Sequence, residues 1–357
     1  MIDLKEYGYF GGDESIARVT AVHKERWEIV SRFGLSGAKL KASVYYQEGS
    51  DALYPAVGDY VRIAYNESGD SIITETLPRT SCFSRSDFSG HALGYVKTIK
   101  AQVVAANFDT VFIVSSLNND FNASRLERYL TLAWNSGAVP VIILTKLDLC
   151  ENPCELIESA KSAAMGADVY AISSVTGEGL SALEKYMTTG KTLVFLGMSG
   201  VGKSSLLNAL AGETLMKVNV TRQIDESKGR HTTTHRQMFR LPSGAIVIDT
   251  PGMREIGMWD VNEGLENAFP DVERLLTECR FSDCRHISEP GCAVLAALES
   301  GELTQERWIS YQTLKNEALF AKSKSAREQK RAFKKSVAVQ SKQIEKHKRF
   351  LEKQSEY

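Results

Sequence analysis

One eight-residue segment constrains the fold of this chain more than any other. It reads Gly197-Met198-Ser199-Gly200-Val201-Gly202-Lys203-Ser204, follows the apolar run TLVFL and precedes the helical pattern SSLLNALAG. A G-x-x-x-x-G-K-[ST] loop between a strand and a helix wraps a polyphosphate with its backbone amides. Its lysine is expected at the β- and γ-phosphates, and the Ser204 hydroxyl on Mg²⁺. The alternative is a glycine-rich turn that binds nothing.

The region around this loop predicts a mostly parallel sheet. From about residue 101 to 257, apolar runs such as VPVIIL and AIVI alternate with helical patterns such as SRLERYLTLAWN. Near-continuous Val/Ile/Leu strands between helices are typical of a sheet covered on both faces. Ligands of such sheets bind beyond the carboxyl ends of the strands. The expected architecture is a multidomain α/β protein with its nucleotide site at that edge.

Two further motifs follow apolar runs of this region. Asp249-Thr250-Pro251-Gly252 comes after AIVI, where Asp249 is expected to hold Mg²⁺ through the second position and the Gly252 amide to meet the γ-phosphate. Thr145-Lys146-Leu147-Asp148 comes after VPVIIL. The Asp148 carboxylate can accept hydrogen bonds from N1 and N2 of guanine, a donor pair that adenine lacks, and Ser173 is expected to shape the pocket around O6.

The order of these motifs is unusual, because the base-reading motif precedes the phosphate loop. Strand order in a sheet need not follow chain order, and permutation succeeds where chain ends lie close together at the surface. All the loops then still meet at one edge of the sheet. Between the phosphate loop and Asp249 lies the polar stretch GRHTTTH, in which Thr233 is expected to complete the Mg²⁺ shell.

The N-terminal segment predicts a small barrel or sandwich. From Arg18 to about Pro78, β-rich runs such as YVRIAY are separated by turn clusters such as NESGD. Five-stranded barrels of this size often bind oligonucleotides, but residues 1–79 hold nine Lys or Arg against twelve Asp or Glu, so an ordinary packing module is an equal alternative. Residues 80–100 are expected to be a connecting segment.

A cysteine and histidine cluster follows the sheet region. Cys279, Cys284, His286 and Cys292 offer three thiolates and one imidazole, the complement of a closed tetrahedral Zn²⁺ site with a structural role. Three core cysteines and a surface histidine are the alternative. We expect the cysteines to be reduced, because no secretory leader is apparent, and reduced cysteines are available as metal ligands. Their close spacing therefore predicts a zinc site.

The last segment is electrostatically distinct from the rest. Residues 322–353 carry twelve Lys or Arg against three Glu, whereas the whole chain has a formal net charge of -1. A basic helical extension that contacts RNA is expected, with a solvated helix or disorder as the alternative. No run approaches the ~18 apolar residues of a membrane span, so we expect a cytoplasmic protein. We also expect a monomer.

Together these features resemble the ribosome small subunit-dependent GTPase A family. The resemblance implies an N-terminal OB-type barrel, a circularly permuted P-loop GTPase domain and a C-terminal helical zinc domain. The expected division is a barrel at 1–79, a GTPase domain at 80–257, a zinc-binding domain at 258–321 and a basic helical extension at 322–357. It also implies action in late maturation of the small ribosomal subunit, with rRNA, GTP and GDP as partners.

The resemblance carries further expectations onto single residues. Residues Gly197 to Ser205 and Thr145 to Asp148 are implied in GTP binding. His231 is a candidate for positioning the attacking water, because the apolar Met253 follows Gly252 where a glutamine would orient it. Slow hydrolysis that the subunit stimulates is therefore expected. The rival hypotheses are an RNA-associated P-loop ATPase or kinase, and a scaffold that binds nucleotide without hydrolysing it.

Overall fold

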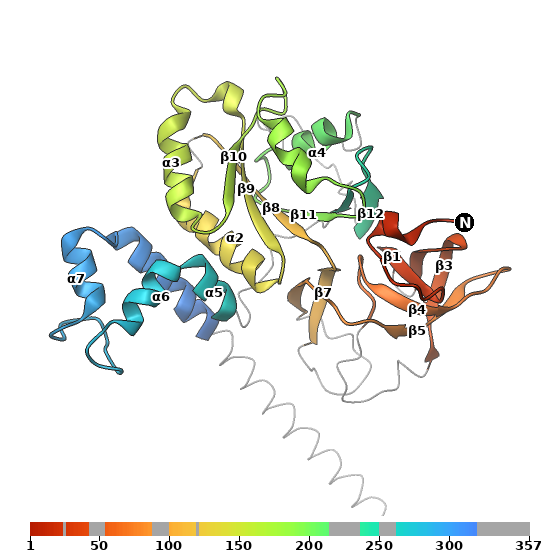
Figure 1. The fold of residues 1–357 in the computed structure, drawn as a ribbon, viewed down its shortest axis with the longest axis horizontal. Coiled ribbons are helices and arrows are strands. Elements are labelled where there is room, and N and C mark those ends of the chain that lie inside the picture. The colour runs from red at the N-terminus through yellow and green to blue at the C-terminus, as the bar shows by residue number, and fades with distance from the viewer. Residues whose placement is uncertain are drawn as a thin grey trace, which may run out of the picture.

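The protein consists of three bodies in a row (Figure 1). The strands of the N-terminal barrel lie at one end, an α/β domain occupies the middle, and the C-terminal helices lie at the other end. The computed structural model describes residues 1–23, 26–42, 54–87, 100–118, 121–213, 236–249 and 262–319. None of the helices in these ranges is long and apolar enough to cross a membrane.

The N-terminal body is a closed five-stranded barrel of the OB type. A short 3₁₀ helix, η1 (Leu4–Tyr7), precedes the barrel. The strands pair in the order β1-β2-β3-β5-β4, and β4 pairs with β1 to close the ring. Trp27, Ile29 and Ile73 are among the buried side chains that fill its interior. The strands are β1 (Ile16–Val22), β2 (Trp27–Ser31), β3 (Gly34–Leu40), β4 (Tyr60–Ala64) and β5 (Ser71–Thr76).

The central body contains the expected sheet, in the order β10-β9-β8-β11-β13-β12. All of these strands are parallel except β12, which pairs with β13 and with β1 in antiparallel fashion, so the sheet continues into the barrel. The strands are β8 (Thr110–Ser116), β9 (Val139–Thr145), β10 (Asp168–Ala171), β11 (Thr192–Leu196), β12 (Arg236–Arg240) and β13 (Ile246–Asp249).

Helices cover both faces of this sheet, as the apolar strand pattern predicts. Along β8, Val111 and Ile113 belong to the core cluster that includes α2 and α3, whereas Phe112 and Val114 belong to the cluster that includes α4. Successive residues of a strand point to opposite faces, so both faces of β8 are buried. The helices are α2 (Ala123–Asn135), α3 (Pro153–Ala163) and α4 (Lys203–Ala211).

One local expectation was wrong. Part of the expected connecting segment 80–100 is strand β6 (Cys82–Asp87), which pairs with β7 (Lys100–Ala106). This pairing joins residues about 20 positions apart, and no local apolar period marks it. The stretch GLSALEKYM forms a 3₁₀ helix, η3 (Leu180–Tyr186), of which only Leu183 is buried. Gly179 begins η3 without a side-chain cap, and a single buried residue gives little packing to support an α-helix.

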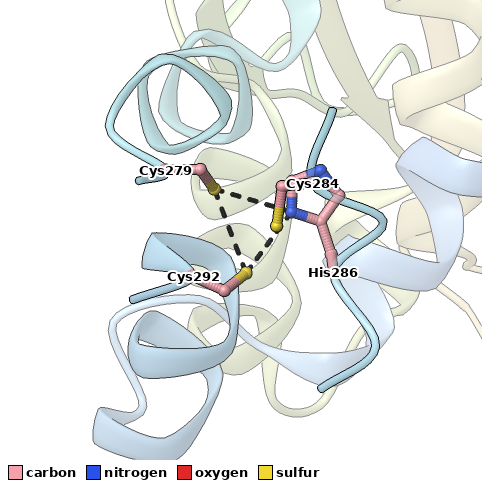
Figure 2. A group of neighbouring side chains, drawn as sticks. All are labelled: Cys279, Cys284, His286 and Cys292. Carbon is pink, nitrogen blue, oxygen red and sulfur yellow. Dashed lines mark hydrogen bonds between the residues drawn. The ribbon is translucent and has the colours of Figure 1, made fainter. Parts of the chain in front are cut away.

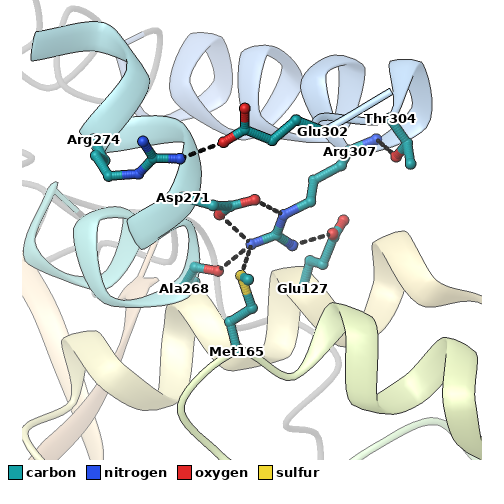
Figure 3. Close-up of polar contacts among 8 residues, drawn as sticks. All are labelled: Glu127, Met165, Ala268, Asp271, Arg274, Glu302, Thr304 and Arg307. Atoms are coloured by element: carbon teal, nitrogen blue, oxygen red, sulfur yellow. Dashed lines mark hydrogen bonds and ion pairs between the residues drawn. The ribbon is translucent and has the colours of Figure 1, made fainter. Parts of the chain in front are cut away.

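The C-terminal body is helical and is docked on α2. Its helices are α5 (Asn262–Ala268), α6 (Pro270–Thr277), α7 (Ala293–Ser300) and a helix at 305–319. The Arg307 guanidinium at the joint forms ion pairs of 2.8 Å with Glu127 of α2 and 2.6 Å with Asp271 of α6 (Figure 3). The guanidinium carbon Cζ of Arg307 lies over the Phe269 ring, 4.6 Å from the ring centre. One buried cation therefore joins the two bodies.

Replacing Arg307 tests this joint. Arg307→Met leaves the Glu127 carboxylate, whose side chain is only 6% exposed, without its cation. Since an unpaired buried charge is strongly destabilising, we expect the free energy of unfolding in urea to fall by about 3 kcal/mol. The exposed Arg274, which pairs with Glu302, is the matched control, and Arg274→Met should have no measurable effect. Equal effects of the two variants would contradict this account of the joint.

Candidate functional site

The phosphate loop connects β11 to α4 in a backbone conformation that requires glycine. Gly197 and Gly202 have φ values of 146° and 96°, which L-residues with a side chain rarely adopt. A Cβ at residue 197 would also overlap the carbonyl oxygen of Val114. Gly202 begins α4 without a side-chain cap. The N-terminus of α4 therefore lies at this loop, an arrangement that in other proteins binds phosphate.

Lys203, the first residue of α4, closes over this loop. Its ammonium donates hydrogen bonds to the carbonyl oxygens of Gly197, at 2.7 Å, and Met198, at 2.5 Å. Ser204 and Ser205 follow in the same turn and are half-buried. The lysine charge therefore lies at the loop that is predicted to hold the phosphates.

Thr145 connects the predicted base reader to the phosphate loop. It ends β9, is 1% exposed, and its hydroxyl lies 2.5 Å from the carbonyl oxygen of Val201. A Cβ at Gly202 would lie 3.2 Å from the same hydroxyl, so the two loops approach closely only because residue 202 is glycine. Segments 56 residues apart in sequence thus share one hydrogen bond.

The turn after Thr145 presents Asp148 at the same edge of the sheet. Lys146 has a left-handed backbone with φ of 63°, and the next residues form the 3₁₀ helix η2 (Leu147–Leu149). A non-glycine residue in this conformation stores strain of about 1 kcal/mol or more, which recurs at ligand sites. The Leu147 amide is anchored at 3.1 Å on the carbonyl of Ile172, after β10. Asp148 itself is exposed.

Ser173 has a more specific contact than the sequence suggests. Its buried hydroxyl donates a 2.6 Å hydrogen bond to one oxygen of the Asp148 carboxylate. The same hydroxyl accepts hydrogen bonds from the amides of Val175, at 3.2 Å, and Thr176, at 3.1 Å. Ser173 therefore orients the carboxylate that is predicted to read the base, and its role at guanine O6 stays a prediction.

The remaining predicted nucleotide ligands lie at the end of a described range or outside the described ranges. Asp249 ends β13, whose residue Ile248 pairs with Val194 of β11, so its backbone lies at the carboxyl edge beside the strand that leads into the phosphate loop. His231, Thr233 and Gly252 lie outside the described residues. Their expected roles stay predictions.

Cys279, Cys284, His286 and Cys292 converge, with their ligand atoms all within 4.8 Å of one another (Figure 2). The Cys279 and Cys292 sulfurs are 3.9 Å apart, and His286 Nδ1 lies 3.6 Å and 3.4 Å from them. Tetrahedral zinc, with bonds of about 2.3 Å to sulfur and about 2.0 Å to nitrogen, needs separations of ~3.8 Å and ~3.5 Å. The four side chains fit such an ion.

The loop that carries His286 is organised by an acidic residue that the sequence analysis missed. Glu289 accepts 2.9 Å hydrogen bonds from the amides of Arg285 and Ile287, and these bonds lower the pKa of its carboxyl to about 2. They hold a turn in which His286 adopts a left-handed backbone with φ of 59°. The motif Ser-Glu-Pro-Gly at 288–291, a turn signal with an acceptor, was the available clue.

The cysteines at the helix ends are also held by backbone donors. Cys292 caps the N-terminus of α7, where its sulfur accepts from the Leu295 amide at 3.5 Å. Burial raises the pKa of Cys279, but hydrogen bonds from the amides of Ala293 and Val294 outweigh it, and the net pKa is lowered. A thiolate at this position is favoured, and metal ions bind the thiolate form.

Comparison with known proteins agrees with the geometry. A family model described as RsgA GTPase matches residues 76–259. The small ribosomal subunit biogenesis GTPase RsgA 2 of Listeria monocytogenes is 45% identical over 331 residues, which are 90% of this chain and 91% of that protein. The chain belongs to the RsgA GTPase family.

Other members of the RsgA family are similar over the same length. The small ribosomal subunit biogenesis GTPase RsgA of Methanosarcina acetivorans is 41% identical, covering 94% of this chain and 88% of that protein. Two solved structures also match. YjeQ from Thermotoga maritima has a TM-score of 0.63 at 27% identity, over 85% of this chain and 98% of that one. YloQ, described as a circularly permuted GTPase, has a TM-score of 0.59 at 25% identity, with coverage of 88% and 98%.

The Thr145 contact predicts a specific loss of affinity. Thr145→Val removes the hydroxyl and leaves the Val201 carbonyl without its donor, so we expect the Kd of GTP and of GDP to rise about tenfold. Thr145→Ser keeps the hydroxyl and should stay within about threefold of the wild type. Isothermal calorimetry would measure both. If serine and valine weaken binding equally, the hydroxyl does not support the site.

Proposed function

We propose that this chain is a GTPase that acts on the small ribosomal subunit during its late maturation. The observation that supports the proposal is the Thr145–Val201 hydrogen bond, which joins the turn predicted to read the base to the loop predicted to bind the phosphates. A single guanosine triphosphate would then extend from Asp148 to Lys203. The relatives named above are small ribosomal subunit biogenesis GTPases, and their similarity over most of the chain supports the same role here.

Each group of the site has a defined task in this proposal. Asp148, oriented by Ser173, accepts the guanine N1 and N2 hydrogens and selects GTP over ATP. Backbone amides of 197–203 bind the phosphates, and Lys203 moves from the loop carbonyls to the β- and γ-phosphates. Ser204, Thr233 and Asp249 would hold Mg²⁺, which neutralises charge on the β- and γ-phosphate oxygens. His231 positions the attacking water, and the Gly252 amide meets the γ-phosphate.

The cysteine cluster serves as a structural zinc site in this proposal. Its four side chains would supply all four ligands of a tetrahedral ion and would leave no position for a reacting water. His286 also packs edge-on against Trp308, with 5.6 Å between ring centres, so the site connects to the core of the C-terminal body. The zinc would therefore fix the loop between α6 and α7 against the helix at 305–319.

The proposed partners are the small ribosomal subunit, its rRNA and guanine nucleotides. Bound GTP holds the protein on the subunit and its rRNA, the subunit stimulates hydrolysis, and hydrolysis releases the protein. The proposed units are the barrel at 1–79, the GTPase domain at 80–257, the zinc domain at 258–321 and the basic extension at 322–357. We propose a cytoplasmic monomer. The basic extension lies outside the described residues, and its surplus of Lys and Arg supports contact with RNA.

GTP hydrolysis in the presence of purified ribosomal subunits tests the function. We expect slow hydrolysis by the chain alone and an increase on the order of 10³-fold with small subunits, because an ordered partner can complete the site. Large subunits serve as the control and should have no effect. Hydrolysis that stays negligible with small subunits would favour a nucleotide-binding scaffold.

The base reader predicts a switch in specificity. Asp148→Asn replaces an acceptor by an amide, which suits the C2 carbonyl of xanthine and leaves the guanine amino group unpaired. We expect GTP affinity to fall about a hundredfold or more while xanthosine triphosphate affinity rises. Asp168→Asn, an exposed carboxylate on β10, is the matched control and should change neither. Equal binding of ATP and GTP by the wild type would refute guanine selection.

The metal assignment predicts a change in metal content. The wild type, purified without chelators, should hold about one zinc per chain, whereas Cys284→Ser should hold almost none. Cys154→Ser, on the exposed surface of α3, should keep the wild-type content. Elemental analysis by mass spectrometry measures all three. A wild type that contains no zinc would remove the assignment.

A further inference from the structure

The barrel is connected to the backbone of Asp249, the predicted magnesium ligand, through the adjacent strands β1, β12 and β13. In β12, Gln237 pairs with Asp249 of β13 on one side and with Ala21 of β1 on the other. Along this ladder a single strand, β12, lies between the barrel strand β1 and Asp249. Backbone hydrogen bonds therefore connect β1 to the end of β13 through β12.

A second contact reaches the same strand from the barrel turn at Gly58. The Gly58 amide donates a 2.9 Å hydrogen bond to the Val19 carbonyl of β1. A Cβ at residue 58, where φ is 93°, would overlap the Ala106 carbonyl oxygen and lie 2.9 Å from Cδ1 of Ile248. Ile248 immediately precedes Asp249. The barrel thus touches β13 directly as well as through β12.

A buried arginine fastens this contact. Arg18 of β1 is 0% exposed and donates to three backbone carbonyls, those of Tyr7 at 2.6 Å, Asn107 at 2.7 Å and Gly58 at 3.2 Å. The three acceptors belong to the N-terminal 3₁₀ helix, the turn between β7 and β8, and the barrel turn. A single guanidinium therefore fixes the barrel against the central body.

Asn107 completes the junction from the side of the central body. It holds a left-handed backbone with φ of 53°, and its side-chain amide donates to the Gly58 carbonyl at 3.3 Å. Its side-chain oxygen accepts from the Thr80 amide at 3.0 Å. The neighbouring barrel carboxylate, Asp59, is paired with Arg79 at 2.7 Å.

We propose that the barrel positions Asp249, and that Arg18 and Asn107 are positioning residues for the magnesium site. The proposal rests on the proposed role of Asp249 in holding Mg²⁺. Because β1, β12 and β13 are hydrogen-bonded neighbours, a partner that binds the barrel would act on the magnesium site without touching the nucleotide. The C-terminal body is attached differently, because its Arg307 pairs with Glu127 of α2. A change at that joint is expected to leave the Mg²⁺ dependence unchanged.

The test measures the Mg²⁺ concentration that half-saturates GTP hydrolysis in the full-length chain. Arg18→Lys keeps the charge but cannot reach three carbonyls, and Asn107→Gly tolerates the left-handed backbone while losing the side-chain bonds. We expect both to raise the half-saturating Mg²⁺ concentration roughly threefold to tenfold, the range of coupling through a packed network. GTP binding without Mg²⁺ should stay at the wild-type value. Arg307→Lys, at the arginine of the other joint, should leave the Mg²⁺ requirement unchanged.

The possible results distinguish failure of the positioning role from failure of the proposed Mg²⁺ site. An unchanged Mg²⁺ requirement in Arg18→Lys and Asn107→Gly, or an equal increase in Arg307→Lys, overturns the positioning role. Asp249→Asn is measured in parallel. If that variant keeps the wild-type Mg²⁺ requirement, Asp249 does not hold the metal, and the proposed site itself is wrong. Should Arg18→Lys fail to fold, Asn107→Gly alone decides.

Discussion

The hydrogen bond between the Thr145 hydroxyl and the Val201 carbonyl is the contact on which the proposed nucleotide site depends. It joins the ends of β9 and β11, which are separated in the sheet by β8 alone. Since parallel strands release their loops at one edge, the order of the motifs along the chain has no bearing on where they meet. A permuted chain can therefore build a common guanine nucleotide site, provided that this edge stays intact.

Two joints of different chemistry hold the central body from opposite ends (Figure 1). At the barrel, the Arg18 guanidinium donates hydrogen bonds to backbone carbonyls, so the joint depends on the backbone and not on a partner side chain. At the C-terminal body, Arg307 binds the carboxylates of Glu127 and Asp271, so the joint depends on paired side chains. Strand pairing connects the barrel joint to β13 through β12, whereas the C-terminal joint contacts the helix α2. The barrel is thus the body better placed to influence the phosphate edge.

Sequence reasoning succeeded where function restricts spacing and residue type. The glycines of the phosphate loop, the parallel strands and the converging cysteines all followed from local patterns. It failed where a contact links distant segments. Nothing local marks Arg18 as the donor to three carbonyls, and the pairing of β6 with β7 has no periodic signal. The contact of Ser173 with Asp148 joins the ends of β9 and β10, so only the fold reveals it.

The most direct test of the account is a structure of the chain bound to a non-hydrolysable GTP analogue and Mg²⁺. The account predicts the guanine edge at the Asp148 carboxylate, the triphosphate within 197–204, and Thr145 still bonded to the Val201 carbonyl. A nucleotide whose phosphates occupy the loop while its base lies away from Asp148 would contradict it.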